Sequence, residues 1–199
     1  MMQKRVPAPP DIPDGAESAA EDDIALVLAA QSDPVAFGKL YQMYRDRVYW
    51  YLLARSGNVE DAADLTQHVF LRAMDALAQY RPEKGPFVAW LFGIARNAAT
   101  NFRQRSLQTV AWDLPVGERS AETEQSLEEI ILRRESLDQL RRLCAALDPV
   151  KQELLALRFV AGLTSAEIGV VIGKSEAAAK KQLTRIVQHL KEQYHDLPS

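Results

Sequence analysis

Apolar residues recur at helical spacing along most of the chain, and this periodicity excludes most fold classes. No segment shows the sustained alternation of apolar and polar residues that a half-buried strand requires. The stretches 34–56, 87–105 and 176–194 instead place apolar side chains three or four positions apart. Because such spacing aligns side chains on one face of a helix, we predict an all-α protein.

Capping residues divide the first half of the chain into four helices, beginning with a short one near Asp23. Ser32 or Asp33 can cap a second helix that has Pro34 at its first position, where a missing N–H costs nothing. Gly57 ends that helix and Asn58 caps a third one. A break with the sequence RPEKGP then separates the third helix from a fourth.

Charge and proline content indicate two small domains rather than one large domain. The chain has 199 residues and a net charge of −3. An acidic, proline-rich tail and an acidic, aperiodic connection flank blocks that are near neutral or slightly basic. We predict a disordered tail at 1–22, a four-helix domain at 23–105, a flexible acidic linker at 106–122 and a second helical domain at 123–199.

The second domain contains the pattern of a helix-turn-helix. Thr164 and Glu167 form a capping box, Gly173 ends a short helix, and Ser175 caps a longer one. Such a second helix can lie in the major groove of DNA, although the same turn also occurs in helical bundles with a solvated basic face. The candidate duplex-DNA contacts are Ser175, Lys180, Lys181, Gln182, Thr184 and Arg185.

The fourth helix and the loop before it carry hydrogen-bonding and cationic side chains beside an apolar stripe. Arginine and amide groups on one rigid face suit phosphates and unpaired bases, and aromatic rings can stack on bases. The alternative is an ordinary amphipathic helix with Trp90 in the core. The candidate single-strand contacts are Tyr80, Arg81, Lys84, Phe87, Arg96, Asn97, Arg103 and Arg105.

The third helix has an acidic face that includes one exposed leucine, Leu71. An apolar residue within an acidic rim suits a protein interface. Taken alone, however, the pattern favours a solvated face with one stray leucine, because scattered surface apolar residues are normal. The candidate residues are Asp61, Asp64, Gln67, His68 and Leu71.

No catalytic motif is present in the sequence. There is no phosphate-binding glycine loop, nucleophile elbow or metalloprotease helix. The single cysteine, Cys144, and three scattered histidines do not supply a metal site. The sequence also has no apolar stretch of membrane-spanning length. Because no apolar core follows Lys4 and Arg5, we expect no secretory signal. We therefore expect a cytoplasmic, non-enzymatic protein without cofactors or metals.

The run 61–73 (DAADLTQHVFLRA) followed by 87–105 (FVAWLFGIARNAATNFRQR) resembles region two of bacterial sigma factors. The run 147–175 (LDPVKQELLALRFVAGLTSAEIGVVIGKS) resembles their region four. The order, the spacing and the overall length resemble the extracytoplasmic-function (ECF) group of the sigma-70 family, which keeps only these two domains.

This resemblance implies a transcription initiation factor that binds core RNA polymerase and promoter DNA. The acidic face of the third helix would dock on the polymerase clamp. The loop and the fourth helix would melt and hold the minus-ten element, and the last helix would read the minus-thirty-five element. The resemblance also implies an anti-sigma factor as a partner, a monomeric free protein and no insertion into the membrane.

The sequence departs from the pattern of the family at several positions. His68 and Asn101 replace residues that are usually acidic, and Ala178, Gln182 and Val187 replace usual residues of the recognition helix. Promoter sequence therefore cannot be transferred from the family. Two rival hypotheses remain, a free-standing helix-turn-helix regulator and a sigma-like adaptor that has lost initiation activity.

Overall fold

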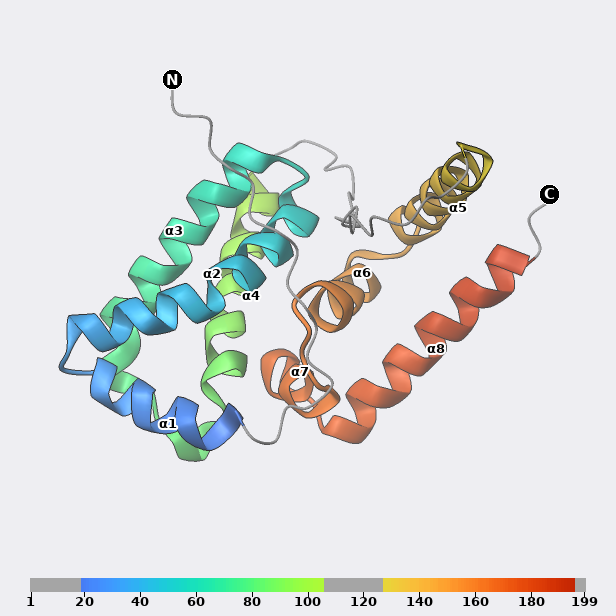
Figure 1. The fold of residues 1–199 in the computed structure, drawn as a ribbon. Helices are drawn as coiled ribbons and strands as arrows, with labels where there is room; N and C mark the ends of the chain where they lie inside the picture. Colours follow the sequence, from blue (N-terminus) through green and yellow to red (C-terminus); the bar gives the residue numbers. More distant parts are fainter. Residues whose placement is uncertain (1–18, 106–126, 196–199) are drawn as a thin grey trace, which may run out of the picture.

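The computed structural model describes residues 19–105 and 127–195. All regular structure within these two ranges is helical, and they contain no strand (Figure 1). The prediction of an all-α fold is therefore confirmed.

The N-terminal unit contains four α-helices, as predicted. These are α1 (Ala19–Ala30), α2 (Pro34–Ser56), α3 (Val59–Ala76) and α4 (Phe87–Arg105). Helix α1 begins at Ala19, so the predicted disordered tail at 1–22 extended four residues too far. The sequence interpretation missed this start because residues 19–22 are small or acidic and carry no apolar periodicity.

Two short 3₁₀ turns, η1 (Leu77–Gln79) and η2 (Pro82–Lys84), connect α3 to α4. Gly85 follows η2 with a φ of 138°, a backbone conformation that favours glycine. The predicted break between the third and fourth helices is thus an ordered connection whose shape depends on Pro82 and Gly85.

The C-terminal unit contains the predicted helix-turn-helix. Its elements are α5 (Leu127–Ala145), α6 (Pro149–Leu155), the π-helical turn η3 (Ala156–Val160), α7 (Ser165–Ile172) and α8 (Glu176–His195). Helices α7 and α8 pack against each other, and α8 extends away from the N-terminal unit (Figure 1).

The helix starts follow the capping signals. The Asp33 carboxylate accepts from the backbone N–H of Val35 at 2.8 Å, and the Asn58 side chain accepts from Glu60 at 2.8 Å. In the capping box, the N–H of Thr164 donates to the Glu167 carboxylate at 2.7 Å, and the N–H of Glu167 donates to the Thr164 hydroxyl at 3.2 Å. Each of these bonds satisfies a backbone donor that has no partner within its own helix.

The two units pack directly on each other. Helix α4 contacts α7, and α2 contacts η3. The sequence predicted two domains on a flexible linker and did not predict this packing. The predicted linker at 106–122 lies outside the described residues.

Candidate protein and nucleic-acid interfaces

The candidate protein-binding face on α3 is exposed as a patch. Leu71 is 59% exposed and Met74, one turn closer to the C-terminus of the helix, is 49% exposed. Asp64, Gln67 and His68 are also exposed, and Asp61 is half-buried. The opposite face of α3 supplies Val69, Phe70 and Ala73 to the core, so the helix is held from one side only.

Met74 enlarges the apolar part of this face. Leu71 was the one apolar residue predicted on this face, although Met74, three positions later, falls on the same side of a helix. Two exposed apolar side chains beside acidic residues have the composition of a protein interface. The exposed Met74 beside Leu71 therefore favours a protein interface over a solvated face with one stray leucine.

The aromatic residues at the two ends of the loop are buried. Tyr80 is 2% exposed and Phe87 is 3% exposed. Their ring centroids lie 5.7 Å apart, and each lies 5.5 Å from the centroid of Trp90. The Tyr80 hydroxyl also donates to the carbonyl of Gly85 at 3.0 Å. These two rings therefore shape the loop from inside, and in this arrangement they do not present a face to a base.

The cationic and amide side chains beside this cluster are more accessible. Arg81, Lys84 and Asn97 are exposed. The Arg81 guanidinium donates to the carbonyls of Ala78 and Tyr80, each at 2.9 Å, so its position is fixed by the backbone. The structure brings these three side chains to one groove of about 440 Å³, whose walls include Trp90 of α4 and Val170 and Val171 of α7.

The arginines of α4 differ in their surroundings. The Nε of Arg96 donates to the carboxylate of Glu153 on α6 at 2.6 Å. Arg103 is half-buried and Arg105 is exposed. Arg96 therefore has a partner from the C-terminal unit, which sequence spacing could not show.

Most of the candidate duplex contacts lie on the exposed side of α8. Lys180, Lys181, Thr184 and Arg185 are exposed, whereas Ala179, Leu183, Ile186 and Leu190 are buried. Ser175 is exposed, and its hydroxyl accepts from the N–H of Ala178 at 3.3 Å. The Thr184 hydroxyl donates to the carbonyl of Lys180 at 3.0 Å, so that donor is already used within the helix.

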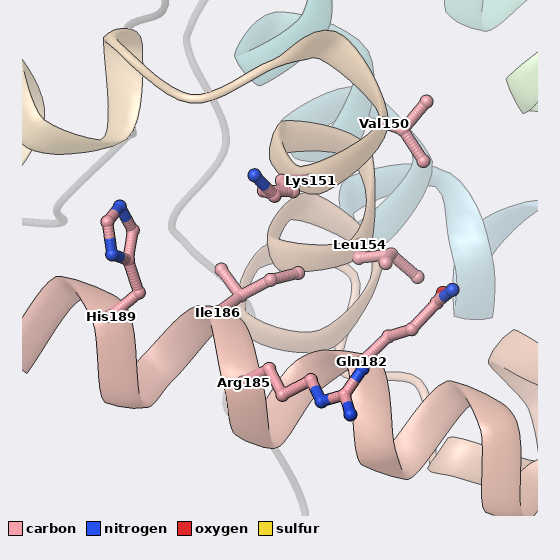
Figure 2. Close-up of a pocket in the computed structure, with 7 residues that line it drawn as sticks. All are labelled: Val150, Lys151, Leu154, Gln182, Arg185, Ile186 and His189. Atoms are coloured by element: carbon pink, nitrogen blue, oxygen red, sulfur yellow. The ribbon is translucent and has the colours of Figure 1, made fainter.

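Gln182 and Arg185 extend from the same side of α8, and Gln182 reaches toward Leu154 of α6 (Figure 2). They line a groove of about 390 Å³ whose other wall includes Val150, Lys151 and Leu154. Gln182 is half-buried, and its side-chain oxygen has no hydrogen-bond partner among the described residues. Lys180, Lys181 and Thr184 do not line this groove, although Lys181 lies one helical turn before Arg185 on the same side of α8.

The structure also bears on the predictions about metals, the single cysteine and membrane spans. Within 19–105 and 127–195, no group of three or more His, Cys, Asp or Glu side chains is arranged to hold a metal ion. Burial raises the pKa of the Cys144 thiol to about 11, so this thiol stays protonated at neutral pH. In the same ranges, no helix has the length and apolar character needed to span a membrane.

Comparisons with known proteins match both units. The family description "Sigma-70 region 2" matches residues 40–108, and "Sigma-70, region 4" matches residues 137–190. The ECF RNA polymerase sigma factor BldN of Streptomyces coelicolor is 38% identical over 181 residues, which cover 86% of this chain and 67% of BldN. The ECF RNA polymerase sigma factor SigD of Mycobacterium tuberculosis is 27% identical over 175 residues, with coverage of 86% and 82%.

A solved structure shares the fold. CnrH, in complex with the cytosolic domain of CnrY, superposes with a TM-score of 0.62 at 22% identity and covers 85% of this chain and 95% of CnrH. At this level of identity the similarity supports the arrangement of helices and nothing more specific.

Proposed function

Because the chain belongs to the sigma-70 family of RNA polymerase sigma factors, in the ECF group, we propose which of its surfaces bind core polymerase and which bind promoter DNA. The protein is a transcription initiation factor that directs core RNA polymerase to promoters. The single observation that carries this function is the presence of both regions, in order, in one chain.

The α3 face is the proposed docking surface for core polymerase. It combines the exposed apolar side chains Leu71 and Met74 with an acidic and polar rim. The apolar centre would supply buried area, and the acidic rim would supply orientation toward a basic partner. The proposed contacts are Asp61, Asp64, Gln67, His68 and Leu71.

The α4 groove is the proposed binding surface for the unpaired minus-ten strand. Arg81, Lys84 and Asn97 line it, and Trp90 forms part of its wall. Arg96, Arg103 and Arg105 continue the basic surface along α4. Tyr80 and Phe87 act here as the buried support of the loop, since their rings pack on Trp90.

Helix α8 is the proposed reader of the minus-thirty-five duplex. Lys180 and Lys181 would neutralise phosphates, and Ser175 lies at the helix start, where an oxyanion is favoured. Gln182 and Arg185 would reach base edges, because amide and guanidinium groups pair with adenine and guanine in the major groove. Thr184 would contribute packing rather than a donated hydrogen bond.

We also propose a cytoplasmic, monomeric and non-catalytic protein that is held by an anti-sigma factor. The solved CnrH structure includes the cytosolic domain of CnrY. A partner that covers the α3 face or α8 would prevent function by simple competition.

Reconstituted transcription tests the proposed function. The full chain is mixed with core RNA polymerase and a library of genomic promoter fragments, and the transcripts are sequenced. We expect transcripts with defined starts that depend on the added chain. A free-standing helix-turn-helix regulator would instead bind an operator tightly as a purified dimer and produce no new starts. A sigma-like adaptor would bind core polymerase without initiating.

Replacing Asp64 with Arg should weaken core-polymerase binding at least tenfold, or about 1.4 kcal/mol. Asp64 lies on the exposed face of α3, so reversal of its charge should repel a basic partner without disturbing the core. Binding is measured by fluorescence titration of the labelled chain with core enzyme. Glu192→Arg makes the same charge change on the exposed face of α8 and should bind core within twofold of the original. Equal affinities for all three proteins, with unchanged helicity, would refute the docking assignment.

A further inference from the structure

A buried arginine at the end of α2 lacks partners for part of its guanidinium. Arg55 is 5% exposed, and its Nε and Nη1 have no hydrogen-bond partner among the described residues. Burial lowers the pKa of Arg55, and the charges of Arg103 and Arg96 lower it further, against the influence of Tyr51 and Glu153. A buried cation with unused donors is costly unless an anion is near it.

The carboxylate that faces this cation comes from the other unit. Glu153 of α6 is 8% exposed and accepts a hydrogen bond from the Nε of Arg96 at 2.6 Å. Its charge also acts on Arg55 and Tyr51. Glu153 therefore pairs with Arg96 and also acts on the buried Arg55, whose guanidinium is further influenced by the positive charges of Arg96 and Arg103.

Two further contacts join the two units. The Nε of Arg47 on α2 donates to the carbonyl of Ala161, just after η3, at 2.9 Å. On the other side, a Cβ added at Gly85 would lie 3.1 Å from a methyl group of Val170, so α7 fits closely against the loop before α4. These contacts define a closed arrangement of the two units.

The closed arrangement also restricts the proposed single-strand surface. Val170 and Val171 form one wall of the groove that holds Arg81 and Asn97. A strand that follows the arginines of α4 would need the space that α6 and α7 occupy. The ion pair and the groove are therefore controlled by the same packing.

We propose that Arg96 and Arg55 form an anion site of the N-terminal unit, which Glu153 occupies in the closed arrangement and a nucleic-acid phosphate takes when the units separate. This inference rests on the proposed function, because it assigns a regulator to the minus-ten surface. Glu153 is then an internal competitor of the promoter strand.

The chemistry of the two anions supports this exchange. Carboxylate and phosphate oxygens both accept charge-assisted hydrogen bonds from guanidinium groups. A carboxylate on the same chain competes at a high effective concentration, whereas a DNA strand brings several phosphates that meet several arginines together. Loss of the carboxylate charge would leave Arg96 and Arg55 without compensation and would favour separation of the units.

The first test measures binding of a fluorescent single-stranded DNA oligonucleotide to the free full-length chain at fixed salt. Glu153→Gln keeps the shape of the side chain and removes its charge. We expect it to bind the oligonucleotide at least about fivefold more tightly than the original chain. Glu176→Gln removes the same charge from an exposed position of the C-terminal unit and should change affinity less than about twofold. Equal gains from both substitutions would overturn the proposal, because they would reflect net charge alone.

The second test measures the separation of the units. Spin labels on Glu60→Cys and Glu192→Cys, in a Cys144→Ala background, report the distance between α3 and α8. We expect a narrow distribution in the original chain and a broader, longer one after Glu153→Gln. An unchanged distribution would overturn the closed arrangement as the basis of competition.

A third comparison locates the anion site. Adding Arg96→Gln or Arg55→Gln to Glu153→Gln should abolish the gain in oligonucleotide affinity, and two positions are tested in case one variant fails to fold. A gain that persists in a folded double variant would overturn the site. If the proposed function itself is wrong, the original chain will produce no promoter-specific transcripts with core polymerase, which is a different result from those above.

Discussion

Replacing Phe92 with Ala should lower the free energy of unfolding of the N-terminal unit by about 3–5 kcal/mol. Phe92 is fully buried in α4, and its ring packs edge-on against Tyr51 of α2 with 5.5 Å between centroids. The guanidinium of Arg47 lies 5.9 Å from the same ring. Truncation would therefore remove apolar area, an aromatic pair and a cation contact at one position.

Thermal and urea unfolding followed by circular dichroism would measure this loss. Thr100→Ala changes an exposed position of the same helix and should alter the free energy of unfolding by less than about 0.5 kcal/mol. If Phe92→Ala costs no more than Thr100→Ala, the α2–α4 contact does not hold the unit together. The residue also lies beneath the Arg47 contact to Ala161, so the same variant should loosen the closed arrangement.

The features that sequence predicted well depend on few, nearby residues. Asp33, Asn58 and the Thr164–Glu167 box each bond a backbone N–H within three positions, so their effect can be predicted from local order alone. The buried stripe of α8 likewise follows from helical spacing. The fold class and the starts of the capped helices were predictable for this reason, whereas the uncapped start of α1 was not.

The features that sequence missed depend on contacts between distant residues. Tyr80 and Phe87 flank a polar loop, so the sequence suggested that their rings are exposed. In the structure they pack with Trp90 and Tyr44 in an aromatic cluster. Helical spacing placed Arg96 on a face that suits phosphate contacts. In the structure Arg96 instead pairs with Glu153, which lies 57 positions away in the sequence. Periodicity assigns a residue to a face of its helix and cannot say which other element covers that face.

The proposed roles of α8 and α4 in DNA binding can be tested separately at two side chains. Arg185 lies on α8, where it lines a groove with Gln182 and is exposed. Asn97 lies on α4, in the groove beside Trp90. The two residues belong to different units, so their proposed roles in duplex recognition and strand capture are separable by experiment.

Arg185→Ala should weaken holoenzyme binding to a duplex promoter by about 1–3 kcal/mol if its guanidinium reads a base. The loss should be much smaller on a template whose minus-ten region is already unpaired, because strand capture then supplies most of the binding. Asn97→Ala should show the reverse, with its largest loss where opening of the duplex limits the rate. Lys181→Ala is the matched control on α8, since loss of a phosphate contact should weaken binding to all sequences and reduce its salt dependence.

Holoenzyme titrations and permanganate footprints on duplex and pre-melted promoters would measure these losses. Permanganate reports unpaired thymines, so it separates binding from melting on the same templates. Asn97→Ala should reduce the footprint on duplex DNA at protein concentrations that still saturate binding, whereas Arg185→Ala should reduce the footprint only through reduced occupancy. Equal impairment of both templates by both substitutions would show that α4 and α8 do not divide recognition and melting between them.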